Sequence, residues 1–280
     1  MAFYSGSRIN TNVGALNALN ALNTLNSKIG THQLRLASGK RINSAADDPA
    51  GYTISQKLVA RSRSLSAALN NVGEAKNILS VAEGGLQSIN DLFVGMKEKV
   101  IQAGNGSYGS EELAAVVTQL QDMLNEIDDA ISETKFNGTN LLNASFTSKL
   151  FQTGADGGDT MTISLSATID SADFSLNSLT SASLQGTALT TTLTSIDSAI
   201  SSVSIELQKV GSYMQRLDVK EQTLQVAMTN TDAAASRIMD ADVAKEQLEL
   251  TKLQILQQTA TIQLTQANSA PQNILQLFGG

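Results

Sequence analysis

Apolar residues recur at alternating steps of four and three along one long stretch of the chain. Between Ile54 and Val100, thirteen of the fourteen positions reached in this way are apolar. This spacing is typical of a coiled-coil seam, a continuous apolar stripe along one face of a helix. The residues that we assign to the buried seam of this helix are Leu58, Leu65, Val72, Leu79, Leu86, Ile89 and Phe93.

Both ends of this helix carry recognisable signals. Asp48 is a good N-cap, and Pro49 suits the first helical position. Gly104 and Gly106 are expected to stop the helix. The sequence therefore predicts a helix over about 49–104, roughly 80 Å long at 1.5 Å per residue.

Two further seams follow along the chain. One begins after Ser110 and covers 113–131, and the other covers 196–238 with interruptions only at Glu221 and Thr231. The positions of the third seam that we expect to be buried include Leu207, Met214 and Leu224. Because isolated helices cannot bury such seams, the pattern predicts an elongated bundle of long, coiled-coil-like helices, a mainly α fold.

The segment between the second and third seams has a different character. Residues 141–190 are rich in serine and threonine, and apolar and polar residues alternate strictly over 161–169. Such alternation predicts a β-strand, with 154–159 as a turn and 150–151 as part of the partner strand. We expect a small β-hairpin region, followed by an exposed segment over 170–190 that has no seam.

Both ends of the chain are helical in pattern but lack a clean seam. Residues 15–26 read ALNALNALNTLN, so leucine and asparagine each spread over a wide arc of the helix. Near the C-terminus, Leu248, Ile255 and Ile262 are seven residues apart on a stretch rich in glutamine. Helices of this kind are poorly stable alone and need partner helices, from the other end of the chain or from other copies.

Composition narrows the function classes. Apolar residues make up 41% of the chain and charged residues 16%, and cysteine is absent. With one histidine, His32, the chain has no disulfide, Cys/His zinc site or haem attachment. The net charge of −7 and the lack of a basic stripe argue against nucleic acid as a partner. No apolar stretch of about 20 residues is present, so no membrane insertion is expected. Residues 1–20 have no continuous apolar run with a small-residue cleavage site, so no signal peptide is expected.

No constellation of catalytic residues is readable. The glycines of 104–109 fit a dinucleotide-binding pattern by letters, but they follow a helix and not a strand. Asp47 and Asp48 are adjacent, so their side chains diverge, and His32 has no readable partner. We expect no catalytic residue, no metal and no cofactor. An enzyme or binding module built on a helical bundle would need converging His, Asp, Glu or Lys side chains.

Several separate motifs resemble those of bacterial flagellins and occur in the same order. Residues 36–58, LASGKRINSAADDPAGYTISQKL, resemble the signature near the start of that family. Residues 90–142 continue the likeness, and 236–247 with 255–280 resemble the family's C-terminal helix and tail. The chain differs in an extended start, Met1–Ser7, before the residues RINTNV at 8–13, and in the absence of a large middle region.

The resemblance implies a structural subunit that polymerises into the flagellar filament for motility. In that family, paired terminal helices form the filament core, corresponding here to 1–46 and 238–280. A helical bundle would comprise 47–140 and 191–237, and 141–190 would be the small β-hairpin with a Ser/Thr-rich exposed segment. The family's variable outer domains would be missing or reduced to part of 141–190. The residues expected to pack between subunits are Ile9, Val13, Leu16, Leu248, Ile255, Ile262, Leu275 and Leu277.

The resemblance also implies partners and a location. Family members are secreted unfolded through the flagellum's own export apparatus, held by a secretion chaperone, and meet filament-cap and hook-junction proteins in the extracellular filament. The rival assignment is a hook–filament junction protein, which shares flagellin-like ends and usually carries a larger middle.

A last implication concerns host recognition. Flagellins that stimulate an animal Toll-like receptor present an Arg-x-Arg-Glu-Leu-like stretch on the first long helix. The corresponding positions here are Gly95, Lys97, Glu98 and Lys99, with glycine at the place of the first arginine. Arginine is a preferred interface anchor, so its loss predicts weak stimulation of that receptor.

Overall fold

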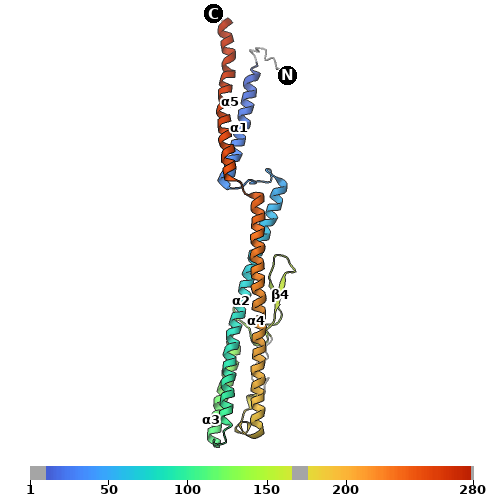
Figure 1. Cartoon of the computed structure of the whole chain (residues 1–280), viewed down its shortest axis with the longest axis vertical. Helices are drawn as coiled ribbons and strands as arrows, with labels where there is room; N and C mark the ends of the chain where they lie inside the picture. The colour runs from blue at the N-terminus through green and yellow to red at the C-terminus, as the bar shows by residue number, and fades with distance from the viewer. Residues whose placement is uncertain (1–10, 166–175, 279–280) are drawn as a thin grey trace. The chain divides into compact units, whose positions relative to one another are not determined.

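The computed structural model describes residues 11–165 and 176–278, and it confirms a mainly helical fold (Figure 1). Its elements are α1 (Val13–Ser38), α2 (Pro49–Ala103), α3 (Ser110–Glu133), β1 (Lys135–Phe136), β2 (Thr139–Asn140), β3 (Lys149–Gln152), β4 (Thr160–Ile163), η1 (Leu176–Ser178), η2 (Ser181–Leu184), α4 (Gly186–Met239) and α5 (Val243–Phe278). The chain forms two compact units. The terminal unit comprises the described parts of Met1–Ala60 and Asn230–Gly280, and the central unit those of Arg61–Thr229. Among the helices described, none has an apolar stretch long enough to span a membrane.

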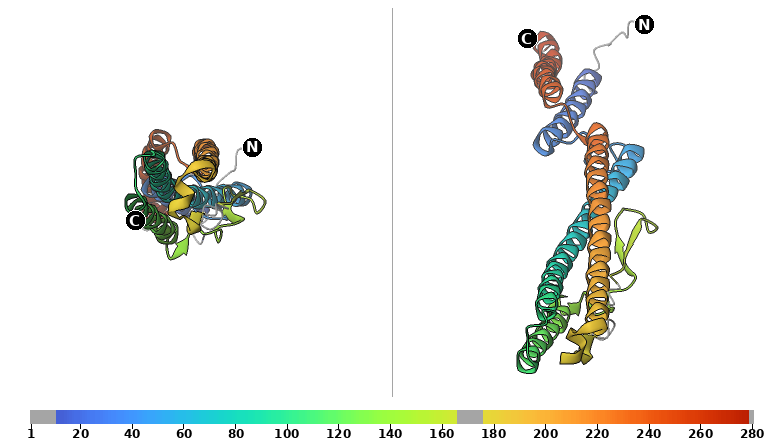
Figure 2. Two further views of the ribbon diagram at one scale, coloured as in Figure 1. Left: turned by 90° about the horizontal axis from the view of Figure 1, so that it is seen from below. Right: turned by 60° about the horizontal axis from the view of Figure 1, so that its bottom comes forward.

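Helix α2 presents its seam to the core of the central unit. Every seam position from Leu65 to Val100 is buried, whereas Leu58 is half-buried and Ile54 is exposed. Helix α3 buries Leu113, Val117, Leu120, Leu124, Ile127 and Ile131 against the same core. Helices α2, α3 and α4 therefore share one continuous apolar core in this unit. Figure 2 shows two further views of the ribbon.

The buried face of α4 differs from the expected one. Ala199 and Glu206 are buried, whereas Leu207 and Met214 lie half-buried beside them, although Leu224 is buried as expected. A step of three followed by four from Ile196 reaches Ala199, Val203, Glu206 and Val210, all of which are buried. At two turns of α4, the buried residue therefore lies one position before the apolar residue that the sequence pattern predicts. Ala199 is buried in place of Ile200, and Glu206 in place of Leu207.

Ion pairs join α2 to α4 at the edge of this core. The Lys76 ammonium lies 2.6 Å from Asp218 Oδ1 and 2.9 Å from Glu221 Oε2. The hydrogen bond to Asp218, followed by that to Glu221, raises the pKa of Lys76. Farther along, Lys97 Nζ lies 2.6 Å from Asp197 Oδ1. These pairs explain why Glu221 stands within an otherwise apolar pattern.

Two short hairpins follow α3. Strands β1 and β2 pair across Asn137 and Gly138, whose φ angles of 48° and 76° are those of a tight turn that favours Asn-Gly. Strands β3 and β4 are antiparallel, with Lys149 opposite Ile163 and Gln152 opposite Thr160. The expected alternating strand over 161–169 therefore ends earlier, and its last four residues lie outside the described part of the chain.

The segment that we expected to be fully exposed is partly buried. Within 170–190, Leu176, Leu179 and Leu184 are buried against the central core, and 170–175 lie outside the described residues. The short helices η1 and η2 lie against α3 and place these leucines inward. Helix α4 then begins at Gly186, ten residues before the predicted seam.

Candidate assembly surface

Helices α1 and α5 lie side by side in the terminal unit and share only a small core (Figure 1). Its buried members are Ile29, Leu250 and Leu253, with Leu25 and Leu36 packed against them. Most side chains on both helices are exposed. The pair therefore buries little apolar surface of its own.

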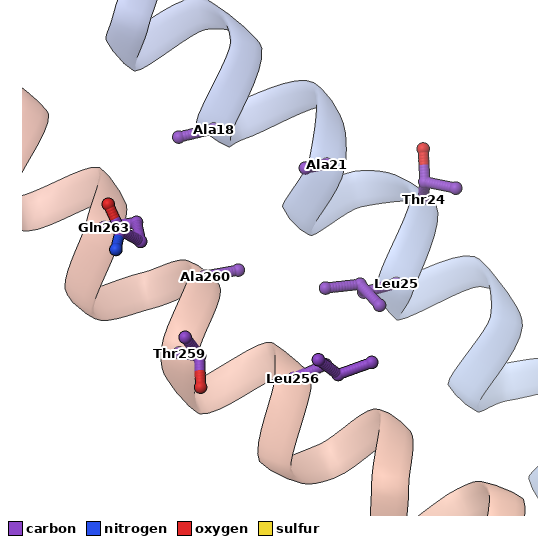
Figure 3. Close-up of a pocket in the computed structure, with 8 residues that line it drawn as sticks. All are labelled: Ala18, Ala21, Thr24, Leu25, Leu256, Thr259, Ala260 and Gln263. Atoms are coloured by element: carbon purple, nitrogen blue, oxygen red, sulfur yellow. The ribbon is translucent and has the colours of Figure 1, made fainter.

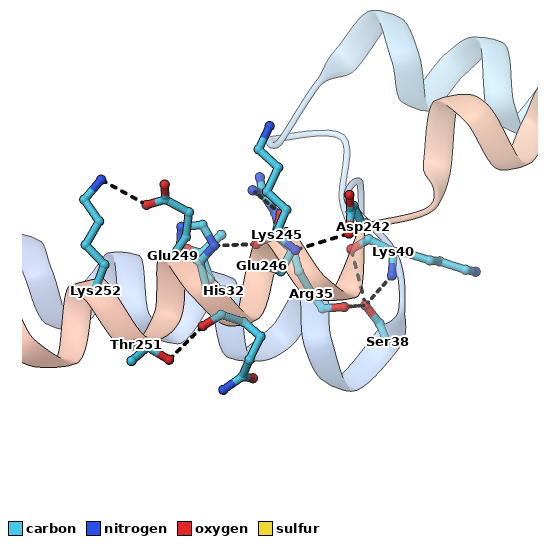
Figure 4. A network of polar contacts seen from close by, with 12 residues as sticks. His32, Arg35, Ser38, Lys40, Asp242, Lys245, Glu246, Glu249, Thr251 and Lys252 are labelled. Carbon is cyan, nitrogen blue, oxygen red and sulfur yellow. Dashed lines mark hydrogen bonds and ion pairs between the residues drawn. The ribbon is translucent and has the colours of Figure 1, made fainter.

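Polar contacts hold the two helices antiparallel. Near the end of α1, the His32 ring contacts Glu246 Oε2, and Arg35 lies 3.6 Å from Glu246 Oε1 (Figure 4). At the other end of the pair, Asn12 Nδ2 donates to the Ala267 carbonyl at 2.7 Å. His32 thus has a carboxylate partner, which sequence reasoning missed because the two residues are 214 positions apart.

A groove separates α1 from α5 midway along the pair. It encloses about 470 Å³. The residues that line it are Ala18, Ala21, Thr24, Leu25, Leu256, Thr259, Ala260 and Gln263 (Figure 3). The side chains of Leu25 and Leu256 point toward one another across the gap, while the alanines leave space beside them. The facing sides of the two helices are therefore incompletely packed.

The outward sides of the pair carry exposed apolar side chains. Among the residues assigned to subunit packing, five are 52–72% exposed, namely Val13, Leu16, Leu248, Ile255 and Ile262. Leu19, Leu34 and Val243 are also exposed, and sequence reasoning did not single them out. Ile9 and the side chains of Leu275 and Leu277 lie outside the described residues. Apolar side chains exposed at this density are typical of surfaces that bind other proteins, and the assignment to subunit packing stays a prediction.

The loop between α1 and α2 lies against the connection between α4 and α5. Gly39 ends α1 with a φ of 68°, a conformation that glycine adopts readily. Lys40 and Asp240 then form an antiparallel bridge, and the Arg41 amide donates to the Met239 carbonyl at 2.7 Å. The α1–α2 loop and the α4–α5 connection are therefore joined by backbone hydrogen bonds.

Two aspartates and one isoleucine give this loop its internal order. The backbone amides of Ser44 and Asn43 donate to Asp47 Oδ2 and hold the pKa of that carboxyl below its usual value of 3.8. Asp48 Oδ1 accepts from the Gly51 amide at 2.9 Å and caps α2. Ile42 is fully buried. The motif RINSAADDPAG is thus a folded structural element of the terminal unit.

The stretch of α2 that resembles the receptor-recognition motif is not uniformly open. Glu98 is exposed, Lys97 and Lys99 are half-buried, and Lys97 is paired with Asp197. Gly95 is half-buried and lies beside α3. A β-carbon added at this position would lie 3.1 Å from the Met123 methyl group. In the described part of the chain, no three His, Cys, Asp or Glu side chains converge as a metal site.

The similarity to known proteins extends over almost the whole chain. Residues 9–147 match the family described as the bacterial flagellin N-terminal helical region, and residues 193–278 match the bacterial flagellin C-terminal helical region. The chain is 32% identical to Flagellin FlaB1 of Treponema pallidum (strain Nichols), covering 96% of this chain and 99% of that protein. It is 34% identical to Flagellin of Bacillus subtilis (strain 168), covering 97% and 99%.

The fold is also similar to a solved structure. A protein described as flagellar hook-associated, from Vibrio parahaemolyticus, matches with a TM-score of 0.60 at 16% identity, covering 69% of this chain and 100% of that chain. At this identity the likeness concerns the fold alone.

Proposed function

Because the chain belongs to the bacterial flagellin family and is a structural, non-enzymatic subunit of the extracellular flagellar filament, we propose that the exposed apolar faces of α1 and α5 are its polymerisation surface. The observation that carries this proposal is the imbalance within the terminal unit. The core shared by α1 and α5 has three buried apolar residues, whereas at least five large apolar side chains on the same helices are mostly exposed.

The energetics favour burial between copies. Ordering backbone costs about 1–2 kcal/mol per residue, which the small shared core cannot offset alone. Fully burying a leucine or isoleucine side chain contributes about 1.5–3 kcal/mol. Neighbouring subunits would supply that burial along the whole length of α1 and α5.

The experiment is a substitution that leaves the free subunit intact. Ile255 and Ile262 are exposed, so Ile255→Asp combined with Ile262→Asp should preserve the helical circular dichroism of the monomer. We expect the natural protein to form filaments on concentration, seen by electron microscopy, and the variant to stay soluble. Gln247→Asp combined with Gln254→Asp adds the same two charges, seven residues apart, at exposed polar positions on another side of the same helix; this matched control should polymerise. Filaments from the Ile255/Ile262 variant would contradict the proposal.

The same face supports the finer partner assignments. Before assembly, the apolar side chains of α5 need cover, and we infer that a secretion chaperone supplies it during export of the unfolded chain. Filament-cap and hook-junction proteins would contact the end subunits through surfaces that other copies cover elsewhere. Loss of chaperone binding in the Ile255/Ile262 variant, measured by co-sedimentation, would support this assignment, and undiminished binding would oppose it.

The junction-protein alternative is not retained. Residues 9–147 and 193–278 match the two flagellin regions, and full-length flagellins align over 96–97% of this chain.

A further inference from the structure

Helix α2 carries an outward ridge in which acidic and apolar residues alternate. Asp91, Val94, Glu98 and Ile101 follow one another at steps of three, four and three, which places them on one face of the helix. All four are exposed, and the ridge lies away from the buried seam. None of the ion pairs among the described residues involves Asp91 or Glu98. We call these four residues the α2 ridge.

Helix α4 carries the complementary pattern. Ile205, Lys209, Ser212, Arg216 and Val219 follow at steps of four, three, four and three, and all five are exposed. We call them the α4 ridge. Lys209 lies 2.7 Å from the buried Glu206, whereas the Arg216 guanidinium is 5.9 Å from the Tyr213 ring centre and has no carboxylate partner in the described residues. The apolar members of the two ridges are 40–63% exposed.

We propose that in the filament the α2 ridge of one copy docks against the α4 ridge of the next copy. The two carboxylates of the α2 ridge are seven residues apart, and so are the two cations of the α4 ridge. Within one chain α2 and α4 run antiparallel, because Lys76 contacts Asp218 and Lys97 contacts Asp197. Copies that point the same way along the filament therefore dock α2 antiparallel to α4. This orientation places Asp91 opposite Arg216 and Glu98 opposite Lys209, and it brings Ile101 beside Ile205. The proposal rests on the chain being a filament subunit.

The location of both ridges on one chain decides the kind of partner. Each copy offers an α2 ridge and an α4 ridge, two different surfaces that fit each other. A contact between unlike surfaces of identical subunits is heterologous, and it propagates into an open helical polymer when the rotation does not close. A second copy of this chain is therefore the occupant that suits both ridges at once.

Charge reversal tests the pairing directly. Arg216→Glu and Asp91→Arg each place like charges across the contact, and each should raise the critical concentration for polymerisation about tenfold, measured by sedimentation. One chain carrying both substitutions restores opposite charges in every contact, so its critical concentration should return to within about threefold of the natural value. Both residues are exposed, so thermal unfolding of the monomers should not change.

Controls separate this contact from general charge effects. Lys135→Glu and Glu126→Arg make the same charge changes at exposed positions outside both ridges and should polymerise normally. Unchanged polymerisation of the single ridge variants, or a double variant no better than the singles, would overturn the proposed pairing. A natural protein that never polymerises would instead contradict its role as a filament subunit, whatever the ridge variants do.

Discussion

Gly51 lies in the first turn of α2, where a β-carbon would meet two side chains at once. It would lie 2.4 Å from Asp48 Oδ2 and 2.8 Å from Ile42 Cδ1. Gly51→Ala should therefore disturb the helix cap and the buried isoleucine together, destabilising the terminal unit by about 1–3 kcal/mol. The measurement is hydrogen exchange of the amides of this loop.

A second glycine provides the control for that variant. Gly30 is in the interior of α1, and a β-carbon there meets nothing within 4 Å. Because glycine in a helix interior costs up to about 1 kcal/mol relative to alanine, Gly30→Ala should slow exchange in the same unit. Equal effects of the two substitutions would show that the close contacts at Gly51 do not matter.

Gly95 is the residue on which we expect receptor recognition to depend. A Toll-like receptor that anchors on arginine at this place would bind this protein weakly, because glycine offers no donor. Gly95→Arg should increase stimulation roughly thirtyfold in a reporter assay on purified monomer, as expected for an interface anchor of about 2 kcal/mol. The flexible Met123 methyl group, 3.1 Å from the new β-carbon, must move aside. Full potency without the substitution would show that recognition here is independent of this position.

At the scale of the element, Glu206 departs most from the apolar pattern of α4. It is 5% exposed; Lys209 pairs with Oε1, and Oε2 has no hydrogen-bond partner among the residues that the structure describes. Replacing a buried charged group by an apolar one of similar size is often stabilising. Glu206→Leu should raise the midpoint of thermal unfolding, with a gain of about 1–2 kcal/mol. Glu206→Ala, which removes the charge but leaves a cavity, should gain less, and a loss with leucine would show that Oε2 has a partner in solution.

The helix α2 was predictable almost to its ends, and α4 was not. Proline fixes the start of α2 and glycine follows its end, so the observed Pro49–Ala103 agrees with the predicted range. The first turns of α4 are rich in serine and threonine and have no seam. One of these threonines, Thr192, is nevertheless buried, and its hydroxyl donates to the Ser183 carbonyl at 3.1 Å. Such tertiary contacts leave no periodic signal in a sequence.

The candidate assembly surface on α1 and α5 was only partly predictable from the sequence, for a similar reason. Leu248, Ile255 and Ile262 are seven residues apart, and this spacing alone indicates one face of a helix. Their exposure, however, depends on what α1 covers. Likewise, no local pattern joins Lys40 to Asp240, because a bridge between distant backbone segments depends on the fold and not on side-chain type.

At the scale of the whole molecule, the terminal and central units should differ in protection. The central unit has a continuous core, whereas α1 and α5 share only a few buried residues. In the free subunit, amides of α1 and α5 should exchange at least about a hundredfold faster than those of α3, because local opening costs less where little apolar surface is buried. In filaments the difference should largely disappear. Slow exchange of α1 and α5 in monomers would contradict dependence on neighbouring copies.

The pairing of α1 with α5 makes assembly depend on a chain that has been translated to its end. Asn12 and the Ala267 carbonyl that it contacts are 255 positions apart, so one helix of the pair comes from each end of the chain. A chain that terminates between α4 and α5 still contains α1 and the central core, but α1 has nothing to pair with. Such a fragment lacks half of the joining surface and should be rejected by the growing tip. The pairing of α1 with α5 should therefore restrict the filament to subunits whose C-terminal helix has been translated.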